Sequence, residues 1–406
     1  MKSIAIVACC DTKYHEIRYM ADFIRNAGHR PLVVDISTGP NVAFTADITR
    51  EEVLREGGWE WADVHRLPKS EAIAAMSASV TRVVGRLQKE KIVDAALGMG
   101  GLQNTVVSSA AFRRLPIGFP KLIVSTIASG YRHFETVVGD RDITVVPSVV
   151  DFTGINPLSE SILGNAAAAI IGMAERGNGE INTAGRNLIA ATLMGITNDT
   201  VMRAMDALRA LGKETISFHS TGMGGRVMEE MIRDGHIRAV MDLTLHEMTA
   251  EYFGGYGYSK GADNRLTAAA EMGVPMLVCP GGIDFACLRK DELFDDEEAR
   301  GYVWHNADLT HTRLYEKEIL DITGTIIRRV NASRGPVTVL LPLGGLRTLC
   351  QEGEPFHKPE TIRRMDAMFR QGLKKEIRYV SSPYAFIDTA FADLIVQETL
   401  KLLEGV

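Results

Sequence analysis

The sequence predicts an α/β protein made of two Rossmann-like, doubly wound domains with mainly parallel sheets. Short apolar runs alternate with helical patterns along the chain, which is typical of parallel strands joined by helices. The length of 406 residues exceeds what one ordinary hydrophobic core supports. A polar, glycine-containing linker at residues 177–182 separates two such alternations. We therefore place the domains at residues 1–183 and 184–406.

The composition argues against several classes of protein. The formal net charge of −6 gives no overall attraction to nucleic acid or to anionic membranes. No uninterrupted apolar run approaches the ~18 residues of a transmembrane helix, and the run at residues 4–10 is too short for a signal-peptide core. We therefore expect a soluble, cytoplasmic protein without nucleic-acid or membrane partners.

The spacing of cysteine and histidine gives no support for a metal or disulfide framework. The five cysteines are an odd number and show no CxxC spacing. The separation of His305 and His311 would not bring them to one face of a helix. The sequence therefore predicts no metal site.

The N-terminal domain begins with a strand at residues 3–9, a polar turn at Asp11 and Thr12, and a helix from Tyr14 to Gly28. The short return to a strand at residues 31–36 indicates a right-handed parallel crossover. Asp35 lies near the end of this strand, where an acid holds a ribose in a classical dinucleotide fold. The turn after the first strand has no glycine and does not match GxGxxG, so a standard NAD site is disfavoured.

A glycine loop lies further along this domain. We expect residues 38–68 to form an excursion or lid over the sheet edge and residues 70–91 to form a helix. The strand at residues 92–97 then runs into Gly-Met-Gly-Gly at residues 98–101, before a helix that Asn104 or Thr105 is expected to cap. Free N–H groups and the helix dipole would favour a phosphate here. The alternative is that the glycines only make a tight turn.

The strand ends of this domain predict one shared crevice. The strands at residues 121–126 and 143–146 end in small polar residues, and parallel strands bring their carboxyl ends to the same edge. We expect a cofactor there, bound by Asp11, Thr12, Asp35, Gly98, Gly100, Gly101, Asn104, Thr105, Ser125 and Thr126. No glycine loop ends in Gly-Lys-Ser/Thr, so a Walker-type loop is excluded and binding is favoured over fast phosphoryl transfer.

A helix at residues 161–176 ends the first domain, and the second domain repeats the alternation. Its strands are expected at residues 188–193, 215–219, 239–245, 275–279, 337–342 and 377–380, and its later helices at residues 227–233, 291–300, 314–330, 359–374 and 388–403. Gly-Met-Gly-Gly recurs at residues 222–225, which suggests a repeated architecture. Residues 252–258 are typical of a mobile loop closing over a ligand, and Lys260, Asp263 and Arg265 are expected on the next helix.

Polar residues at strand ends of the second domain form a candidate substrate cleft. We expect catalysis by His219, Glu247, Arg226 and Asp284, with Glu229, Asp263, Arg265 and His305 in the same group. Glu247 or His219 would act as a general base. Arg226 or Arg265 would hold a carboxylate or phosphate, and residues 281–282 would present backbone donors to an oxyanion. The alternative is that the histidines only bond neighbouring loops and that Glu229 and Asp263 sit at helix N-termini.

The chain also resembles a known family. Six phrases carry the resemblance, in the same order: ACCDTKYHEIRYM, GMGGLQNT, SSAAFRRLPIGFPKLIVSTIASG, VVPSVVDFTGIN, FHSTGMGGRVMEEMI and FADLIVQETL. They are similar to the family of the tomato tobamovirus-resistance protein, an ATP-binding inhibitor of viral RNA replication. The resemblance implies two Rossmann-like subdomains, dimers, and ATP bound at Gly98, Gly100, Gly101 and Thr105 with the Asp11–Thr12 turn. Residues 102–104 depart from the plant member, which has small residues there.

The plant relatives also continue into a barrel domain, which implies a separately encoded barrel-domain partner for this chain. Their antiviral role is specialised and is not transferred.

Two main hypotheses follow from the sequence. In the first, the protein binds ATP, with or without Mg²⁺, in the first domain and works as an enzyme component or regulated subunit of small-molecule metabolism, as a homodimer or higher oligomer. In the second, it is a lyase or hydrolase acting on a carboxylate or phosphorylated acid in the second domain. A scaffold with empty clefts is the third possibility. Whether the protein is an enzyme, and whether ATP is hydrolysed, stay open at this point.

Overall fold

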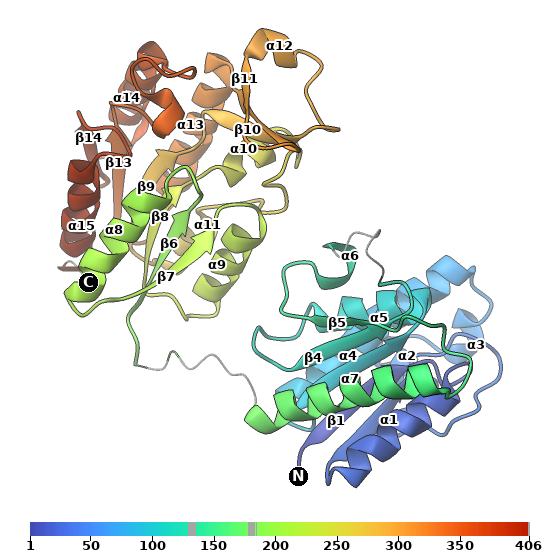
Figure 1. Cartoon of the computed structure of the whole chain (residues 1–406). Helices are drawn as coiled ribbons and strands as arrows, with labels where there is room; N and C mark the ends of the chain where they lie inside the picture. Colours follow the sequence, from blue (N-terminus) through green and yellow to red (C-terminus); the bar gives the residue numbers. More distant parts are fainter. Residues whose placement is uncertain (129–134, 178–182, 184, 405–406) are drawn as a thin grey trace. The chain divides into compact units, whose positions relative to one another are not determined.

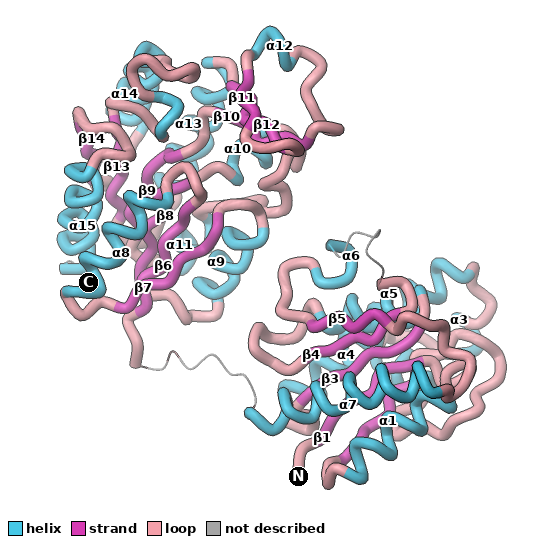
Figure 2. Tube along the Cα trace, in the orientation of Figure 1, coloured by secondary structure: helices cyan, strands magenta, loops and turns pink. Residues whose placement is uncertain are grey.

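The computed structural model describes residues 1–128, 135–177, 183 and 185–404 (Figure 1). The chain divides into two compact units, Met1–Asn182 and Thr183–Val406. Each unit contains a parallel sheet with helices on both of its faces (Figure 2). The predicted class, two Rossmann-like α/β domains with mainly parallel sheets, is therefore confirmed.

The N-terminal unit has a five-stranded parallel sheet in the order β2-β1-β3-β4-β5. Its strands are β1 (Ser3–Ala8), β2 (Arg30–Asp35), β3 (Ala95–Gly100), β4 (Lys121–Ser125) and β5 (Thr144–Pro147). Alternate residues of β1 enter two different cores: Ile4 and Ile6 pack on one side, and Ala5 and Val7 on the other. Burial on both faces explains why the strand reads as an unbroken apolar run.

Two pairs of helices cover this sheet. α1 (Tyr14–Asn26) and α7 (Pro157–Arg176) pack on one face, and α4 (Lys69–Lys89) and α5 (Leu102–Phe112) pack on the other. α7 begins four residues before the predicted start, because Asn156 caps it through a capping box and Pro157 occupies its first turn. The short helix α6 (Glu135–Val138) completes the unit.

The predicted lid at residues 38–68 is instead largely part of the packed domain. It contains α2 (Arg50–Glu56) and α3 (Trp61–Val64), and Val53, Leu54 and Val64 are wholly buried in the core. Thr49 and Glu52 form a capping box at the start of α2. The Thr-x-x-Glu spacing was readable in the sequence, but burial of the short helices depends on contacts with α4 and β2.

The C-terminal unit has a six-stranded parallel sheet in the order β14-β13-β9-β8-β6-β7. Its strands are β6 (Leu188–Leu193), β7 (Glu214–His219), β8 (Ala239–Thr244), β9 (Met276–Gly281), β13 (Val337–Pro342) and β14 (Arg378–Ser382). Its helices are α8 (Asn198–Ala210), α9 (Met223–Arg233), α10 (Glu247–Tyr252), α11 (Thr267–Met272), α12 (Glu297–Arg300), α13 (Glu316–Asn331), α14 (Pro359–Gly372) and α15 (Thr389–Glu404), with the 3₁₀ helix η1 at Thr348–Cys350. Numbered from its first strand, this sheet repeats the order of the N-terminal sheet and adds one strand.

A small antiparallel sheet of the C-terminal unit was missed in the sequence. It has the order β10-β12-β11, built from β10 (Phe285–Arg289), β11 (Tyr302–Trp304) and β12 (Leu309–Arg313). The predicted helix at 291–300 and loop at 304–306 are therefore wrong, and α12 is the only helical part of that acidic segment within the described residues. The carboxylate of Glu297 accepts hydrogen bonds from Thr310 and Thr312, so tertiary pairing with β12 overrides the local pattern.

The aromatic segment at residues 252–258 lies against this small sheet. The N–H of Tyr258 donates to the carbonyl of Cys287 at 2.8 Å, and the hydroxyl of Tyr256 donates to the carbonyl of Glu292 at 2.6 Å. Motion of this segment over a ligand stays a prediction.

Within the described residues, no helix is both long enough and apolar enough to cross a membrane. The five cysteines are buried free thiols.

Candidate functional site

A pocket of about 550 Å³ lies at the carboxyl ends of β1, β2 and β3. The turn after β1 contributes Asp11 and Thr12, and the start of α5 contributes Gly101 and Asn104. In the order β2-β1-β3-β4-β5, the chain leaves β1 in one direction and returns on its other side at β3. Ligands of open α/β sheets bind at such a switch point. The structure therefore brings four of the predicted cofactor-binding residues together at the place where the topology favours a ligand.

Two helices begin beside this pocket. Within the described residues, no side chain caps the start of α1 or of α5. The prediction that Asn104 or Thr105 caps α5 is wrong, because the N-cap residue is Gly101. The side-chain oxygen of Asn104 accepts the N–H of Cys9 at 3.0 Å, and the hydroxyl of Thr105 donates to the carbonyl of Gly101 at 2.9 Å. These side chains fix the loops, and the first-turn N–H groups of α5 are left without a side-chain acceptor.

The glycines of this loop have different structural reasons. Gly98 and Gly100 end strand β3, and only Gly101 lines the pocket. A Cβ on Gly98 would lie 2.6 Å from the Cβ of Ser108, so this glycine lets α5 pack closely on β3. Gly100 has φ +144°, and a Cβ there would lie 1.9 Å from Nδ2 of Asn104. A Cβ on Gly101 would meet only the hydroxyl of Thr126, at 3.6 Å.

The predicted acids occupy different depths. Asp11 lines the pocket, and its carboxylate accepts the N–H of Gly39 and the hydroxyl of Thr12, both at 3.1 Å. Asp35 is 2% exposed and accepts the N–H groups of Cys10 at 3.1 Å and Ser37 at 2.8 Å. Burial raises the pKa of Asp35, and the hydrogen bonds from Ser37 and Cys10 oppose that shift. Asp35 therefore ties the turn after β1 to the end of β2.

Ser125 and Thr126 lie at the end of β4, outside the described lining of the pocket. The hydroxyl groups of Ser125 and Thr105 are 2.7 Å apart and both residues are buried, so this pair joins α5 to β4.

Three basic side chains that the sequence analysis did not single out also line the pocket: Lys13, His65 and Lys69. Nζ of Lys13 donates to the carbonyl of Phe152 at 2.6 Å. Lys69 is exposed at the first residue of α4. Nothing in their local sequence marks them, because the folding of residues 38–68 decides that they meet the β1 turn.

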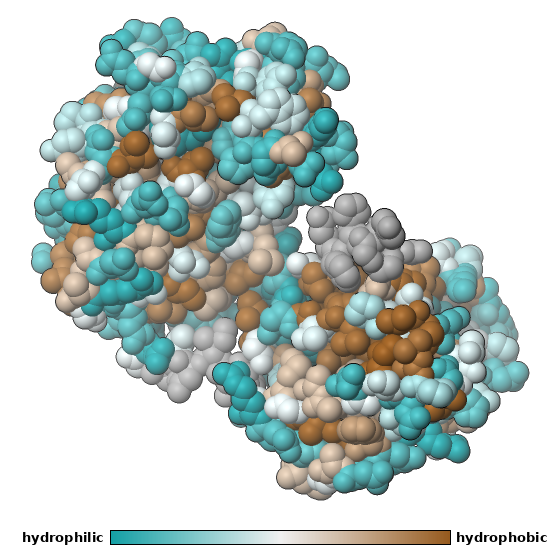
Figure 3. Space-filling model, viewed as in Figure 1, coloured by the Kyte–Doolittle hydropathy of each residue, from teal (hydrophilic) through white to brown (hydrophobic). Residues whose placement is uncertain are grey.

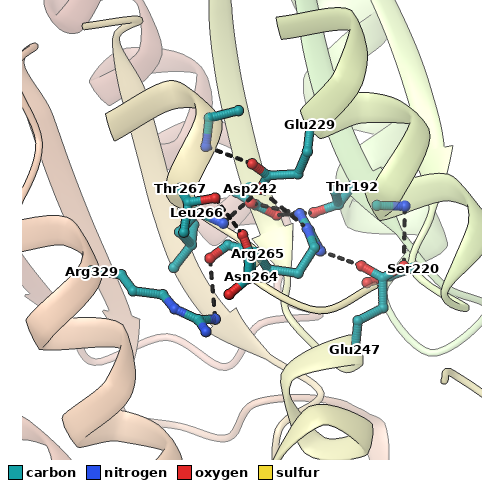
Figure 4. A network of polar contacts seen from close by, with 12 residues as sticks. Thr192, Ser220, Glu229, Asp242, Glu247, Asn264, Arg265, Leu266, Thr267 and Arg329 are labelled. Carbon is teal, nitrogen blue, oxygen red and sulfur yellow. Dashed lines mark hydrogen bonds and ion pairs between the residues drawn. The ribbon is translucent and has the colours of Figure 1, made fainter. Parts of the chain in front are cut away.

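The C-terminal unit contains a buried charge network around Arg265 (Figure 4). This arginine is fully buried and is paired with Asp242 at 2.7 Å, with Glu247, and with Glu229 at 3.6 Å. Arg265 lies before α11, in a turn that ends at Leu266 with φ +69°, so the prediction of Arg265 on a helix is wrong. Burying one guanidinium among three carboxylates is stable only because further donors share the charge.

Backbone donors at two helix starts supply that help. The carboxylate of Glu247 accepts the N–H groups of Gly222 at 2.7 Å and Gly225 at 3.0 Å, at the start of α9. The carboxylate of Glu229 accepts the N–H groups of Leu266 and Ala268, both at 2.6 Å, at the start of α11. Burial raises the pKa of both Glu229 and Glu247, and Arg265 opposes the shift.

The two Gly-Met-Gly-Gly segments therefore differ in structure. The first ends a strand, whereas the second begins helix α9 with Gly222 as its N-cap residue at φ +94°. A Cβ on Gly225 would lie 2.0 Å from Oε2 of Glu247, so the carboxylate already fills the space that an anion would take. Glu247 is 1% exposed, which places its carboxylate inside the protein.

The remaining predicted catalytic residues make separate local contacts. Nδ1 of His219 lies 3.1 Å from the hydroxyl of Thr221, and burial lowers the pKa of His219. Arg226 lies on α9, near the backbone of Gly261. Asp284 follows β9 and pairs with Arg347 at 2.7 Å. The contacts of Glu247, His219 and Asp284 thus connect each of them to different partners.

A second polar cluster, which the sequence analysis found only in part, surrounds Asp284. Arg347 follows β13, is fully buried, and lies between the rings of Phe285 and Phe356 at 4.0 and 4.6 Å. His246 and His311 pack on Phe285 at centroid distances of 4.2 and 4.5 Å. Burial lowers the pKa of His246 to about 4 and that of His311 to about 3. The rule that polar residues after parallel strands share one edge would have found Arg347.

We expect Gly98→Ala and Gly101→Ala to differ in their effect on stability. The added methyl at residue 98 clashes with Ser108, so Gly98→Ala should lower the free energy of unfolding by about 1–3 kcal/mol. The change at residue 101 should stay within about 0.5 kcal/mol, because its backbone suits any residue and the space is open. Urea unfolding followed by circular dichroism measures both. Equal losses would show that the packing explanation is wrong.

Removing the arginine of the buried network should destabilise the protein strongly. Arg265→Met leaves carboxylates buried without their cation, which should cost about 3–5 kcal/mol in urea unfolding at neutral pH. Arg209→Met, which breaks an exposed pair with Asp206, is the matched control and should cost less than about 1 kcal/mol.

The loss in Arg265→Met should depend on pH. Without the guanidinium, the pKa values of Glu229 and Glu247 rise further above their unfolded values, so the folded variant binds more protons than the unfolded chain. Its stability then falls as pH rises, and the deficit against the native protein should be smaller near pH ~5 than near pH ~8. A deficit that does not change with pH would contradict this account.

Comparison with known proteins gives matches along the whole chain. The model of the N-terminal domain of the uncharacterised protein family UPF0261 matches residues 2–178, and that of its C-terminal domain matches residues 186–403. A UPF0261 protein of Clostridium tetani is 33% identical over 406 residues, which cover 99% of both chains. The ToMV resistance protein Tm-1(GCR237) of Solanum lycopersicum is 30% identical over 98% of this chain and 55% of its own. The chain thus spans about half the length of the tomato protein.

Solved structures show only weak similarity. The UDP-GlcNAc 2-epimerase of Methanocaldococcus jannaschii has a TM-score of 0.23 at 9% identity, over 68% of this chain and 83% of its own. MurG of Acinetobacter baumannii has a TM-score of 0.24 at 13% identity, over 98% of this chain and 100% of its own. Similarity at this level carries no argument about function.

Proposed function

Because the chain belongs to the UPF0261 family over both of its units, we propose its function from the geometry of the N-terminal pocket. The N-terminal unit binds ATP, with or without Mg²⁺, and the protein works as an enzyme component or regulated subunit of small-molecule metabolism. The observation that carries this proposal is the pocket at the β1/β3 switch point, into which the residues at the start of α5 open.

The phosphates belong at the start of α5. Gly101, Leu102 and Gln103 line the pocket there, and no described side chain caps the helix. Its first-turn N–H groups and the positive end of its dipole favour negative charge. Lys69, exposed on the opposite wall at the start of α4, supplies a mobile positive charge. This arrangement suits binding, since it lacks the lysine that a Walker-type loop places on the transferred phosphate.

The rest of the pocket suits the other parts of a nucleotide. Val64, Leu67 and Ala72 form an apolar wall on which a base could lie. Asp11 offers a carboxylate, which is the ligand type that Mg²⁺ prefers. The volume of about 550 Å³ lies within the ~300–1,000 Å³ range of small-molecule sites.

Self-association into dimers belongs to the same proposal and rests on the family resemblance. Figure 3 shows apolar residues gathered on the visible face of the N-terminal unit. The exposed apolar side chains of this unit include Leu102 and Val106 on α5, and Val149. Apolar groups of this kind support an interface between copies of the chain.

A second candidate function is a lyase or hydrolase reaction on an acid in the C-terminal unit. One observation favours it: Asp284, among the predicted catalytic residues, lines a pocket of about 390 Å³. The neighbouring Arg347, His246 and His311 would replace Glu247 and His219 in that role, because Glu247 is buried in the Arg265 network.

ATP should raise the thermal unfolding midpoint of the full-length protein. A ligand at about 100 times its Kd stabilises the native state by about 2.7 kcal/mol. Lys69→Gln should weaken ATP binding about tenfold, since it removes a charge that faces the phosphates. Lys89→Gln, at the other end of the same helix α4, is the matched control and should bind as the native protein does.

Differential scanning fluorimetry with ATP–Mg²⁺, ATP–EDTA, ADP and GTP measures the midpoints, and isothermal titration calorimetry gives the affinities. The absence of any shift with all four solutions would sink the proposal. Equal affinity of Lys69→Gln and Lys89→Gln would remove Lys69 from the site.

A further inference from the structure

The pocket of about 390 Å³ in the C-terminal unit is built entirely from elements of that unit. Its walls come from the end of β12, the start of α13, the segment after β13 and the first turns of α14. The volume is within the ~300–1,000 Å³ typical of small-molecule sites. The three features described next decide which chemistry it suits.

Most of the wall is apolar. The apolar lining side chains belong to Leu314, Ile319, Leu346, Phe356, Ile362 and Met365, and all are buried. A ligand that covers such a wall must itself present an apolar body, since a polar body would lose its hydration without gaining partners.

A buried carboxylate oxygen faces this wall. The side chain of Asp284 is 8% exposed, and its Oδ2 accepts from Nε of Arg347 at 2.7 Å and from Sγ of Cys350 at 3.1 Å. Within the described chain, Oδ1 of Asp284 has no hydrogen-bond partner. A buried acceptor of this kind costs free energy until a donor reaches it. Because Arg347 already balances the charge of Asp284, the fitting donor is a neutral hydroxyl group rather than an ammonium.

The charges that remain in the lining are positive. Glu316 pairs with Arg364 at 2.6 Å, and Glu360 pairs with Arg363, so both lining acids are balanced. Arg313 and Lys358 also line the pocket, and neither is paired with a carboxylate among the residues that the structure describes. Lys358 is the N-cap residue of α14, whose first turn adds the positive end of a helix dipole. An anionic group on the ligand would find its partners here.

From these three features, we propose that this pocket binds a hydroxylated organic acid with an apolar body. The acid group lies against Arg313, Lys358 and the start of α14. The hydroxyl group donates to Oδ1 of Asp284, and the apolar body lies on the wall around Phe356 and Met365. This site is independent of the nucleotide pocket, because the residues of the two pockets belong to different units.

The test uses the full-length protein and three matched probes. 3-Phenyllactate carries the hydroxyl and the carboxylate, 3-phenylpropanoate lacks the hydroxyl, and 3-phenylpropane-1,2-diol lacks the carboxylate. Isothermal titration calorimetry should show one site that binds 3-phenyllactate at least about tenfold more tightly than either of the other probes. 2-Hydroxyhexanoate, with a slimmer body, tests whether the aromatic ring is needed.

Two variants locate the acid group. Lys358→Gln should weaken binding of 3-phenyllactate about fivefold or more and leave binding of the diol unchanged. Lys317→Gln is the matched control, because Lys317 is 81% exposed on α13, pairs with Asp321, and lies outside the described lining. Its affinities should match those of the native protein.

Three results would overturn the proposal: no binding of 3-phenyllactate or 2-hydroxyhexanoate at millimolar concentration, equal affinity for all three phenyl probes, or equal affinity in Lys358→Gln and Lys317→Gln. An ATP titration on the same protein samples separates this failure from failure of the nucleotide site.

Discussion

The N–H groups in the first turn of a helix need acceptors, and this protein meets that requirement in two ways. At α9 and α11, the chain supplies its own carboxylates, from Glu247 and Glu229. At α1 and α5, no described side chain provides a cap, and both starts lie beside a pocket. A filled helix start is part of the fold, whereas an open one beside a pocket is a place for an external anion. This difference separates the two glycine segments, which look alike in the sequence.

The same distinction explains why the C-terminal unit tolerates so much buried charge. Arg265 and the backbone donors of two helices share three carboxylates, so each charge has more than one partner. Thr192 also donates to Asp242, which connects the network to strand β6. Such a network holds α9, α10 and α11 in fixed positions around the sheet. The residues that looked catalytic from their place after strands, Glu229, Glu247 and Arg265, are thereby explained by folding.

Asp284 and Arg347 present the opposite case. Their pair is buried, but Oδ1 of Asp284 and both Nη atoms of Arg347 have no hydrogen-bond partner in the described chain. Two aromatic rings cover the guanidinium, and two histidines with lowered pKa values lie on one of those rings. Incomplete pairing next to a pocket is more typical of a ligand site than of a structural ion pair. The chemistry of the C-terminal unit is therefore better sought at the ends of β9 and β13 than at the start of α9.

The sequence by itself determined the fold class, most strands of the two parallel sheets and the crevice at Asp11, Thr12, Gly101 and Asn104. These follow from local apolar periodicity and from the rule that parallel strands share one carboxyl edge. Only the tertiary structure decided that Asn104 serves Cys9, that Asp35 is buried, that Lys69 reaches the pocket, and that Glu247 fills the second glycine segment. It also decided that residues 285–313 form a small antiparallel sheet. The physical reason is that a polar side chain at a strand end can face either a ligand or another part of the chain, and only the packing of distant segments fixes which partner it finds.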